Sequence, residues 1–94
     1  MILSFRDKDT AALFDGKRSR RIPADLAQRA LRKLVLLDTA VKLDDLRVPP
    51  GNMLERLTGD RSGQHSIRVN DQWRICFEWF DGDAHNVEFV DYHE

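Results

Sequence analysis

GQHSIRVNDQWRICFEWF, residues 63–80, alternates apolar and polar side chains on both sides of Asn70-Asp71. This alternation is typical of half-buried β-strands, and Asn and Asp tolerate the backbone angles of tight turns. We therefore predict two antiparallel strands joined by a tight turn at Asn70-Asp71. The odd positions form the predicted buried face: Ile67, Val69, Trp73, Ile75, Phe77 and Trp79. The even positions form the predicted open face: Gln64, Ser66, Arg68, Gln72, Arg74, Cys76 and Glu78.

The segments before this hairpin predict a short strand and two helices. The apolar run Ile2 to Phe5 predicts the strand, and Asp7 is the expected N-cap of a helix over residues 10–14 that stops at Gly16. A longer helix is predicted from Pro23, a residue that the first turn tolerates. Its apolar residues recur at helical spacing and should cover the odd face of the hairpin: Leu26, Ala27, Ala30, Leu31, Leu34, Leu37 and Val41.

The remaining segments complete an α+β fold. Residues 43–52 contain two prolines and a glycine and predict a connection, and residues 53–57 predict the first strand of the main sheet, followed by a loop over residues 58–63. Asp81-Gly82-Asp83 predicts a second turn, and residues 84–92 a last strand with Val87 and Phe89 on the core side. We expect an N-terminal strand and two helices on one face of a mainly antiparallel sheet, with the opposite face open.

Length and composition limit the class of protein. The 94 residues suit a single domain, residues 1–94, and no run approaches the roughly 18 apolar residues of a membrane helix. The apolar start is too short for a signal peptide, so we expect a cytoplasmic protein without membrane contact. Cys76 is the single cysteine, which excludes an internal disulfide and fits a reducing compartment.

The charge distribution is uneven despite a net charge of −1. All 15 lysines and arginines lie at or before Arg74, whereas residues 75–94 carry acidic side chains and no basic ones. The densest basic segment contains Lys17, Arg18, Arg20 and Arg21, and is followed by Arg29, Arg32 and Lys33. Such a segment is either a solvated surface or a site for nucleic acid or another acidic partner, and both interpretations stay open.

Strand parity places candidate functional groups on the open face. Arg68, Arg74 and Tyr92 all occupy even positions and can converge there, and arginine forks match the oxygens of a phosphodiester. Asp91 and His93 flank the Tyr92 ring and add candidate groups for proton transfer. The structural alternative is that both arginines pair across strands with Glu78 or Glu88.

Other site chemistries fit less well. His65, His85, His93 and Cys76 match no metal-ligand spacing, and no glycine-rich phosphate loop is present, so we predict neither a metal nor a cofactor. Cys76 lies in mid-strand between apolar neighbours, which favours a packed thiol over a nucleophile.

Three motifs resemble those of HigB-type toxins, the plasmid-maintenance killer proteins of the RelE/ParE toxin–antitoxin superfamily. They are Gly59-Asp60-Arg61-x-Gly63, Trp73-Arg74-Ile75-x-Phe77 and Asp91-Tyr92-His93, and the resemblance covers essentially the whole chain. It implies a compact RelE/ParE-like fold and a type II toxin that inhibits translation as a ribosome-dependent mRNA endoribonuclease. The implied partners are the ribosome, mRNA and a HigA-type helix-turn-helix antitoxin, with DNA reached only through that antitoxin.

The resemblance also implies roles for individual residues. The implied catalytic group is Arg74, Asp91, Tyr92 and His93. The predicted RNA-binding residues come from the sequence pattern instead: Arg68 from its place on the open face, and Lys17, Arg18, Arg20 and Arg21 from the basic segment. Arg56 and Arg61 are added as replacements for positive charge that is missing at Glu55 and Thr58. Glu55 and Thr58 stand where some relatives carry a histidine and a lysine, which leaves the general base open. The alternative is a ParE-like toxin that inhibits a DNA topoisomerase by binding alone; a DNA-binding or regulatory subunit is disfavoured, since no helix-turn-helix signature is evident.

Overall fold

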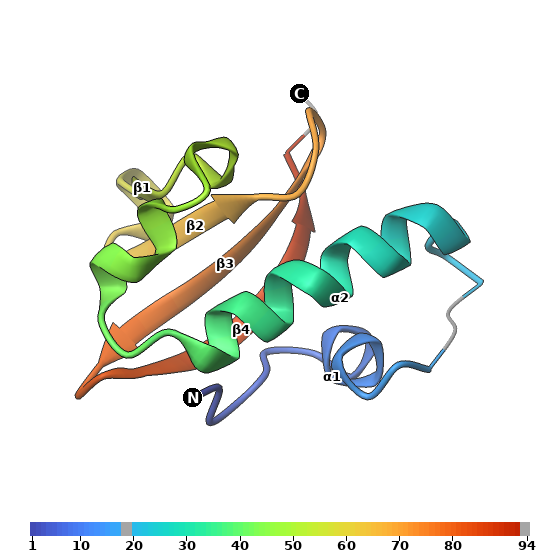
Figure 1. The fold of residues 1–94 in the computed structure, drawn as a ribbon, viewed down its shortest axis with the longest axis horizontal. Coiled ribbons are helices and arrows are strands. Elements are labelled where there is room, and N and C mark those ends of the chain that lie inside the picture. The colour runs from blue at the N-terminus through green and yellow to red at the C-terminus, as the bar shows by residue number, and fades with distance from the viewer. Residues whose placement is uncertain (18–19, 93–94) are drawn as a thin grey trace.

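Two helices lie on one face of a four-stranded sheet in the computed structural model, which describes residues 1–17 and 20–92 (Figure 1). The helices are α1 (Lys8–Phe14) and α2 (Ala24–Thr39), with short 3-10 helices η1 (Leu43–Arg47), η2 (Pro50–Asn52) and η3 (Gly59–Arg61). The sheet is antiparallel in the order β1 (Glu55–Arg56), β2 (Gln64–Arg68), β3 (Trp73–Phe80) and β4 (Asp83–Asp91). The predicted α+β fold is therefore confirmed.

The core lies between α2 and the odd-numbered face of the hairpin, as predicted. Ile67, Ile75 and Phe77 are fully buried there. On the helix side the fully buried residues are Ala30, Leu34 and Leu37. Burying a large apolar side chain contributes about 1.5–3 kcal/mol, so this helix–sheet contact is the main source of stability.

The turn between β2 and β3 is longer than the predicted two-residue turn. Such a turn would place Arg68 opposite Trp73, but the register pairs Arg68 with Arg74. The Asn70 side chain makes the extra residue possible, because its Oδ1 accepts hydrogen bonds from the backbone N–H groups of Gln72 (2.9 Å) and Trp73 (2.7 Å). With the longer turn, odd residues of β2 lie opposite odd residues of β3, so that Ile67, Ile75 and Phe77 share the core face.

The even-numbered face is not open throughout, which corrects the prediction. Ser66, Arg74 and Cys76 are buried at its centre. The segment before β1 covers part of this face, because the Met53 carbonyl accepts a hydrogen bond from Arg74 (2.6 Å). The Tyr92 ring lies over another part, with its centre 5.9 Å from the Arg74 Cζ. The face therefore carries a partly closed polar layer instead of a free surface.

The N-terminal segment runs beside β4 and leads into α1 as predicted. It forms two isolated parallel bridges, Ile2 with Ala84 and Phe5 with Val87, instead of a continuous strand. The Asp7 carboxylate then caps α1 by accepting a hydrogen bond from the backbone N–H of Thr10 (2.7 Å).

Two predicted boundaries are wrong. The helix predicted to include Val41 ends at Thr39, because the N–H groups of Val41 and Lys42 both bond Asp45 Oδ2 at 3.0 Å and start η1 instead. The strand predicted over residues 53–57 is reduced to Glu55–Arg56, since Met53 adopts a left-handed backbone with φ 44° that a strand excludes. In the described part of the chain, no helix has the length and apolarity needed to span a membrane.

Candidate active site

Arg74 lies at the centre of the even-numbered face with its guanidinium held in place on several sides. Its Nε donates to Ser66 Oγ (2.8 Å), and its Nη2 donates to the carbonyl oxygens of Met53 (2.6 Å) and Ser66 (3.3 Å). Glu55 Oε2 lies 3.8 Å from the same nitrogen. Because a buried cation needs hydrogen-bond partners, these acceptors both stabilise Arg74 and fix its orientation.

Tyr92 lies against Arg74 at the edge of this face. The Arg74 Cζ is 5.9 Å from the centre of the Tyr92 ring, within the range of a cation–π contact, and the Tyr92 N–H donates to the Gln72 carbonyl (2.6 Å). The side chain remains 38% exposed. Burial of its hydroxyl, reinforced by Cys76, raises the pKa of Tyr92. The hydroxyl is therefore protonated at neutral pH and able to donate a hydrogen bond to a ligand.

Arg61 reaches the same polar layer from η3. Gly59 and Gly63 flank this residue at φ 65° and φ 92°, in the left-handed region that glycine adopts without steric strain. The turn directs Arg61 Nη1 to Gln64 Oε1 (3.1 Å) and Glu88 Oε1 (2.9 Å). The hydrogen bond to Glu88 raises the pKa of Arg61. The Gly59-Asp60-Arg61-x-Gly63 motif thus has a structural basis.

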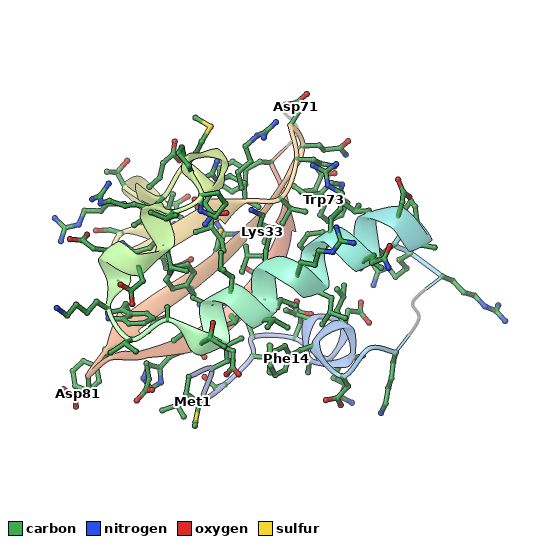
Figure 2. All side chains as sticks on the ribbon, in the orientation of Figure 1. Met1, Phe14, Lys33, Asp71, Trp73 and Asp81 are labelled. Atoms are coloured by element: carbon green, nitrogen blue, oxygen red, sulfur yellow. The ribbon has the colours of Figure 1, made fainter. Side chains whose placement is uncertain are left out.

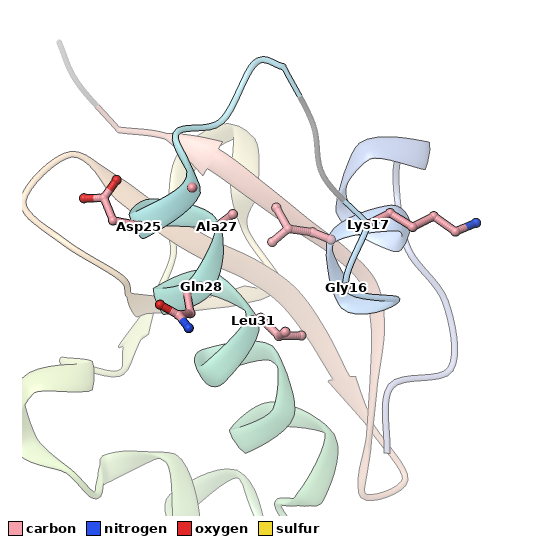
Figure 3. Close-up of a pocket in the computed structure, with 8 residues that line it drawn as sticks. Gly16, Lys17, Asp25, Ala27, Gln28 and Leu31 are labelled. Carbon is pink, nitrogen blue, oxygen red and sulfur yellow. The ribbon is translucent and has the colours of Figure 1, made fainter.

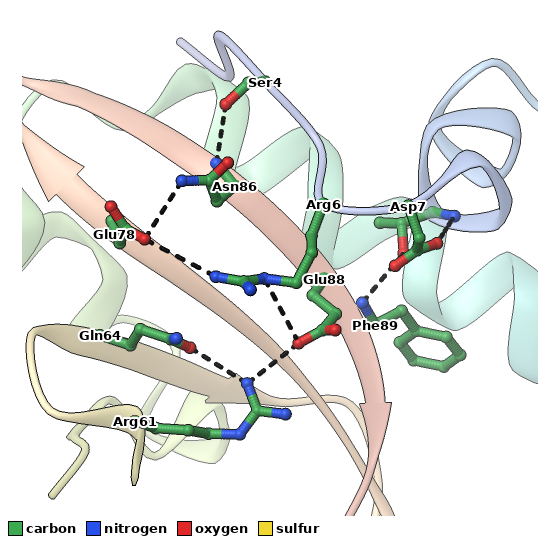
Figure 4. A network of polar contacts seen from close by, with 10 residues as sticks. Ser4, Arg6, Asp7, Arg61, Gln64, Glu78, Asn86, Glu88 and Phe89 are labelled. Carbon is green, nitrogen blue, oxygen red and sulfur yellow. Dashed lines mark hydrogen bonds and ion pairs between the residues drawn. The ribbon is translucent and has the colours of Figure 1, made fainter.

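A network of polar side chains connects this layer to the N-terminal segment (Figure 4). Glu88 lies 3.9 Å from the Arg6 guanidinium as well as bonding Arg61, and Arg6 also lies 3.8 Å from Glu78. The predicted alternative, in which Glu78 or Glu88 pairs with Arg68 or Arg74, is therefore wrong. Arg6 could not be predicted from the sequence, because its approach depends on how the N-terminal segment packs beside β4.

Cys76 lies beneath Tyr92 and is fully buried, which confirms the predicted packed thiol. Burial raises the pKa of the thiol. A neutral buried thiol is a poor nucleophile, so Cys76 supports the Tyr92 hydroxyl instead of reacting itself. The residues that the structure describes contain no cluster of three or more histidines, cysteines or carboxylates able to hold a metal ion.

The other predicted site residues do not gather around Arg74. Asp91 lies opposite Trp73 in the sheet and bonds Gln72 Nε2 through Oδ2 (3.0 Å), while His93 lies outside the described residues. Arg68 pairs with the Asp71 carboxylate and lines a separate groove beside α2. Arg56 lies opposite His65, whose pKa is lowered by burial and then by the charge of Arg56.

The predicted basic segment lies between the two helices. Lys17 lines a groove of about 560 Å³ between α1 and α2, together with Asp25, Gln28 and Leu31 (Figure 3). Arg21 forms an ion pair with Asp9 at 3.0 Å, Arg20 is exposed, and Arg18 lies outside the described residues. Figure 1 shows α1 and the start of α2 on the side of the molecule away from β1, so Lys17, Arg20 and Arg21, which adjoin these helices in the chain, form a surface distinct from the Arg74 layer.

Comparisons with known proteins identify the family of this chain. Residues 3–93 match the model of a family described as the RelE-like toxin of type II toxin–antitoxin system HigB. The chain is 45% identical over 95 residues to Toxin HigB-1 of Vibrio cholerae, covering 100% of this chain and 99% of that protein. It is 37% identical over 93 residues to Endoribonuclease HigB of Proteus vulgaris, covering 99% and 100% respectively.

Two solved structures share the fold at low sequence identity. The YoeB–YefM complex from Staphylococcus aureus gives a TM-score of 0.63 at 13% identity, covering 100% of this chain and 99% of the matched chain. A mutant of YafQ from E. coli gives 0.62 at 12% identity, covering 97% and 93%. The family match and both HigB relatives extend over essentially the entire chain. The chain therefore belongs to the HigB-like family of RelE-like toxins from type II toxin–antitoxin systems.

Proposed function

We propose that this protein is a ribosome-dependent endoribonuclease that cleaves mRNA and so inhibits translation. The observation that carries the proposal is the Arg74 guanidinium, fixed by Ser66 and Met53 beside the partly exposed Tyr92 ring. The similarity to a protein named Endoribonuclease HigB supports it. A fixed cation next to a partly exposed aromatic side chain suits a phosphodiester flanked by a base that can stack.

The proposed reaction uses the substrate's own 2′-hydroxyl. That oxygen attacks the adjacent phosphorus, the bond to the 5′-oxygen of the next nucleotide breaks, and a 2′,3′-cyclic phosphate forms. Arg74 neutralises the extra charge on the pentacovalent phosphate, since a preorganised donor needs no reorganisation during the reaction. Tyr92 holds its proton at neutral pH and donates a hydrogen bond to the phosphate or to the departing oxygen.

The remaining predicted residues take supporting roles in the proposal. Asp91, the last residue of β4, and His93, two positions later in the sequence, are proposed to supply proton-transfer groups, including the base that accepts the 2′-hydroxyl proton. Arg61 adds positive charge to the polar layer. Lys17, Arg20 and Arg21 form the second basic surface, which contacts ribosomal RNA through its phosphates.

The proposed partner that restrains the toxin is a HigA-type helix-turn-helix antitoxin. Membership of a type II toxin family and the resemblance to YoeB in its complex with YefM support an antitoxin partner. DNA is then reached only through the antitoxin. Because ribosomes are the proposed site of action, the proposed location is the cytoplasm.

The alternative of a ParE-like toxin that blocks a topoisomerase by binding alone is not favoured. It requires no fixed cation beside a partly exposed tyrosine, whereas Arg74 and Tyr92 supply that arrangement. The relative named an endoribonuclease also argues for chemistry over simple binding.

The direct test maps mRNA 5′ ends in a translating extract to which the purified protein is added. We expect new ends within ribosome-covered codons, and none on the same mRNA incubated without ribosomes. Translation that stops without new ends would overturn the nuclease proposal. In that case, measuring inhibition of purified DNA topoisomerases would be the next experiment.

A further inference from the structure

A groove of about 390 Å³ between α2 and the end of β2 carries four basic side chains. Arg29, Arg32 and Lys33 line it from α2, and Arg68 lines it from β2. Leu36, Val69 and Gly51 complete the lining. The groove lining therefore combines apolar residues with four positively charged side chains.

The four cations in this groove have few acidic partners. Arg29 Nη2 donates to the Val69 carbonyl (3.0 Å), and Lys33 donates to the Asn52 side chain, which are both neutral acceptors. Arg68 pairs with Asp71, whose side chain is 98% exposed, and such a surface pair is worth only about 0–1 kcal/mol. Arg32 makes no hydrogen bond or ion pair with any residue that the structure describes.

The neighbouring positive charges in the groove affect the pKa of Lys33. Burial lowers the pKa of Lys33, and the charges of Arg29 and Arg68 lower it further. Repulsion of this kind is relieved when a polyanion enters, because each phosphate neutralises a cation and releases bound counterions. The groove is thus predisposed to bind an anion.

The groove and the Arg74 site lie on the two sides of one short segment. Lys33 bonds the side chain of Asn52, and Arg74 bonds the carbonyl of the next residue, Met53. Arg68 also lies directly opposite Arg74 in the β2–β3 register. Figure 2 shows Lys33 between α2 and the segment that leads to β1. An RNA strand with one phosphate at Arg74 therefore has this groove on the other side of the Asn52-Met53 segment.

We propose that this groove binds the sugar–phosphate backbone of the substrate RNA next to the phosphate that is cleaved. The proposal rests on the proposed function and adds a binding site to it. Arg29, Arg32 and Arg68 provide planar forks for phosphate oxygens, and Lys33 provides a point charge. Because none of these contacts reads a base edge, the groove increases affinity for RNA of any sequence.

The test measures binding of a short fluorescein-labelled RNA strand by fluorescence anisotropy. Every ribose of the strand carries a 2′-O-methyl group, so the nucleophile is absent and binding is separated from cleavage. The test variants are Arg32→Gln and the double variant Arg32→Gln/Lys33→Gln. The control is Lys8→Gln, which removes an exposed cation from α1 and changes the net charge by the same amount as the single test variant.

We expect the double variant to bind about tenfold more weakly, equally for different sequences. The slope of log affinity against log salt concentration should decrease by about 0.7 for each phosphate that the variant no longer binds. Lys8→Gln should bind like the wild type. Thermal unfolding of each variant verifies that the fold is retained, and Arg32→Gln, whose side chain has no partner to lose among the described residues, is the safer variant.

Unchanged affinity and slope in both groove variants would overturn the proposal. It would equally be overturned if RNA binding stayed constant while binding to ribosomes or to the antitoxin weakened, because the occupant would then be another molecule. The two proposals can fail separately. If the protein cuts translated mRNA but the groove variants bind RNA like the wild type, only the groove proposal is rejected. If the protein never cuts mRNA but the groove variants bind RNA more weakly, only the nuclease proposal is rejected.

Discussion

Arg74 and Tyr92 show how single residues acquire a function from their surroundings. An arginine on a strand is usually exposed, but Ser66, Met53 and Glu55 surround this one and leave its guanidinium in one orientation. Tyr92 lies at the solvent side of the same group and keeps its proton at neutral pH. The proposed chemistry at this site uses the Tyr92 hydroxyl, which a phenylalanine would remove while retaining the ring.

Tyr92→Phe removes that hydroxyl and retains the ring over Arg74. We expect mRNA cleavage to fall by about 10²-fold, the usual effect of losing a positioned donor or acid. The melting temperature should change little, because phenylalanine retains the packed ring and loses only the hydroxyl. The measurement is the cleavage rate on ribosomes under single-turnover conditions, and a rate equal to that of the wild type would remove Tyr92 from the mechanism.

Cys76 gives a second prediction for a single residue, based on its raised pKa. A raised pKa means that less thiolate is present at any given pH than in a free cysteine, and thiolate is the reactive form. We expect iodoacetamide to modify the native protein at about pH 8 much more slowly than the urea-unfolded chain, as followed by mass spectrometry. Equal rates in the two states would show that the thiol is accessible and not packed beneath Tyr92.

Turns and short elements determine which side chains reach the site. The η3 turn directs Arg61 toward Glu88 because Gly59 and Gly63 adopt left-handed backbone angles. The sequence predicted a loop here and identified the motif, but its geometry became evident only in the structure. A non-glycine residue would strain this turn even where no neighbouring atom is in the way.

Gly63→Ala tests this role of the η3 turn. We expect a loss of about 1 kcal/mol in the free energy of unfolding, because alanine is disfavoured at φ 92° although the space around its Cβ is open. Gly51→Ala is the matched control, since this glycine also has open space around it but lies outside the left-handed region. Urea denaturation measures both. Equal stability of the two variants would contradict the backbone explanation.

The elements also show how much of the fold the sequence could predict. The alternation of apolar and polar residues in the hairpin predicted the buried face correctly. Side chains alternate between the two faces of a strand, so burying Ile75 and Phe77 places all residues of that set on the core face. It could not predict the longer turn, which depends on hydrogen bonds to the Asn70 side chain. Nor could it predict that residues near Met53 fold over Arg74, because that closure is set by long-range packing.

Stability of the whole molecule depends on the contact between α2 and the sheet. Leu34 is fully buried at its centre, whereas Val35, the next residue, is 46% exposed. We expect Leu34→Ala to lower the free energy of unfolding by about 2–5 kcal/mol, and Val35→Ala to change it by about 0.5 kcal/mol. Thermal unfolding by circular dichroism tests both, and the predicted single domain should give one transition. Similar effects of the two substitutions would place the core elsewhere.

In the whole molecule, basic side chains gather in two separate regions. The Arg74 layer and the α2 groove adjoin one segment, while Lys17, Arg20 and Arg21 lie at the connection between the helices. The sequence indicated the basic segment and Arg74, but strand parity grouped Arg68 with the site instead of with α2. That difference follows from the position of Arg68 at the end of β2, where its long side chain reaches around toward the helix.

The most direct test of the proposed chemistry is the rate at which the Arg74→Lys variant cleaves ribosome-bound mRNA in a single turnover. Lysine retains the charge but loses the planar fork that bonds Ser66 and Met53. Arg47→Lys is the matched control, because Arg47 is an exposed arginine paired with Asp44. With folding verified by circular dichroism, we predict about 10²-fold slower cleavage by Arg74→Lys and an unchanged rate for the control. A folded Arg74→Lys protein that cleaves at the wild-type rate would contradict the claim that this guanidinium stabilises the transition state.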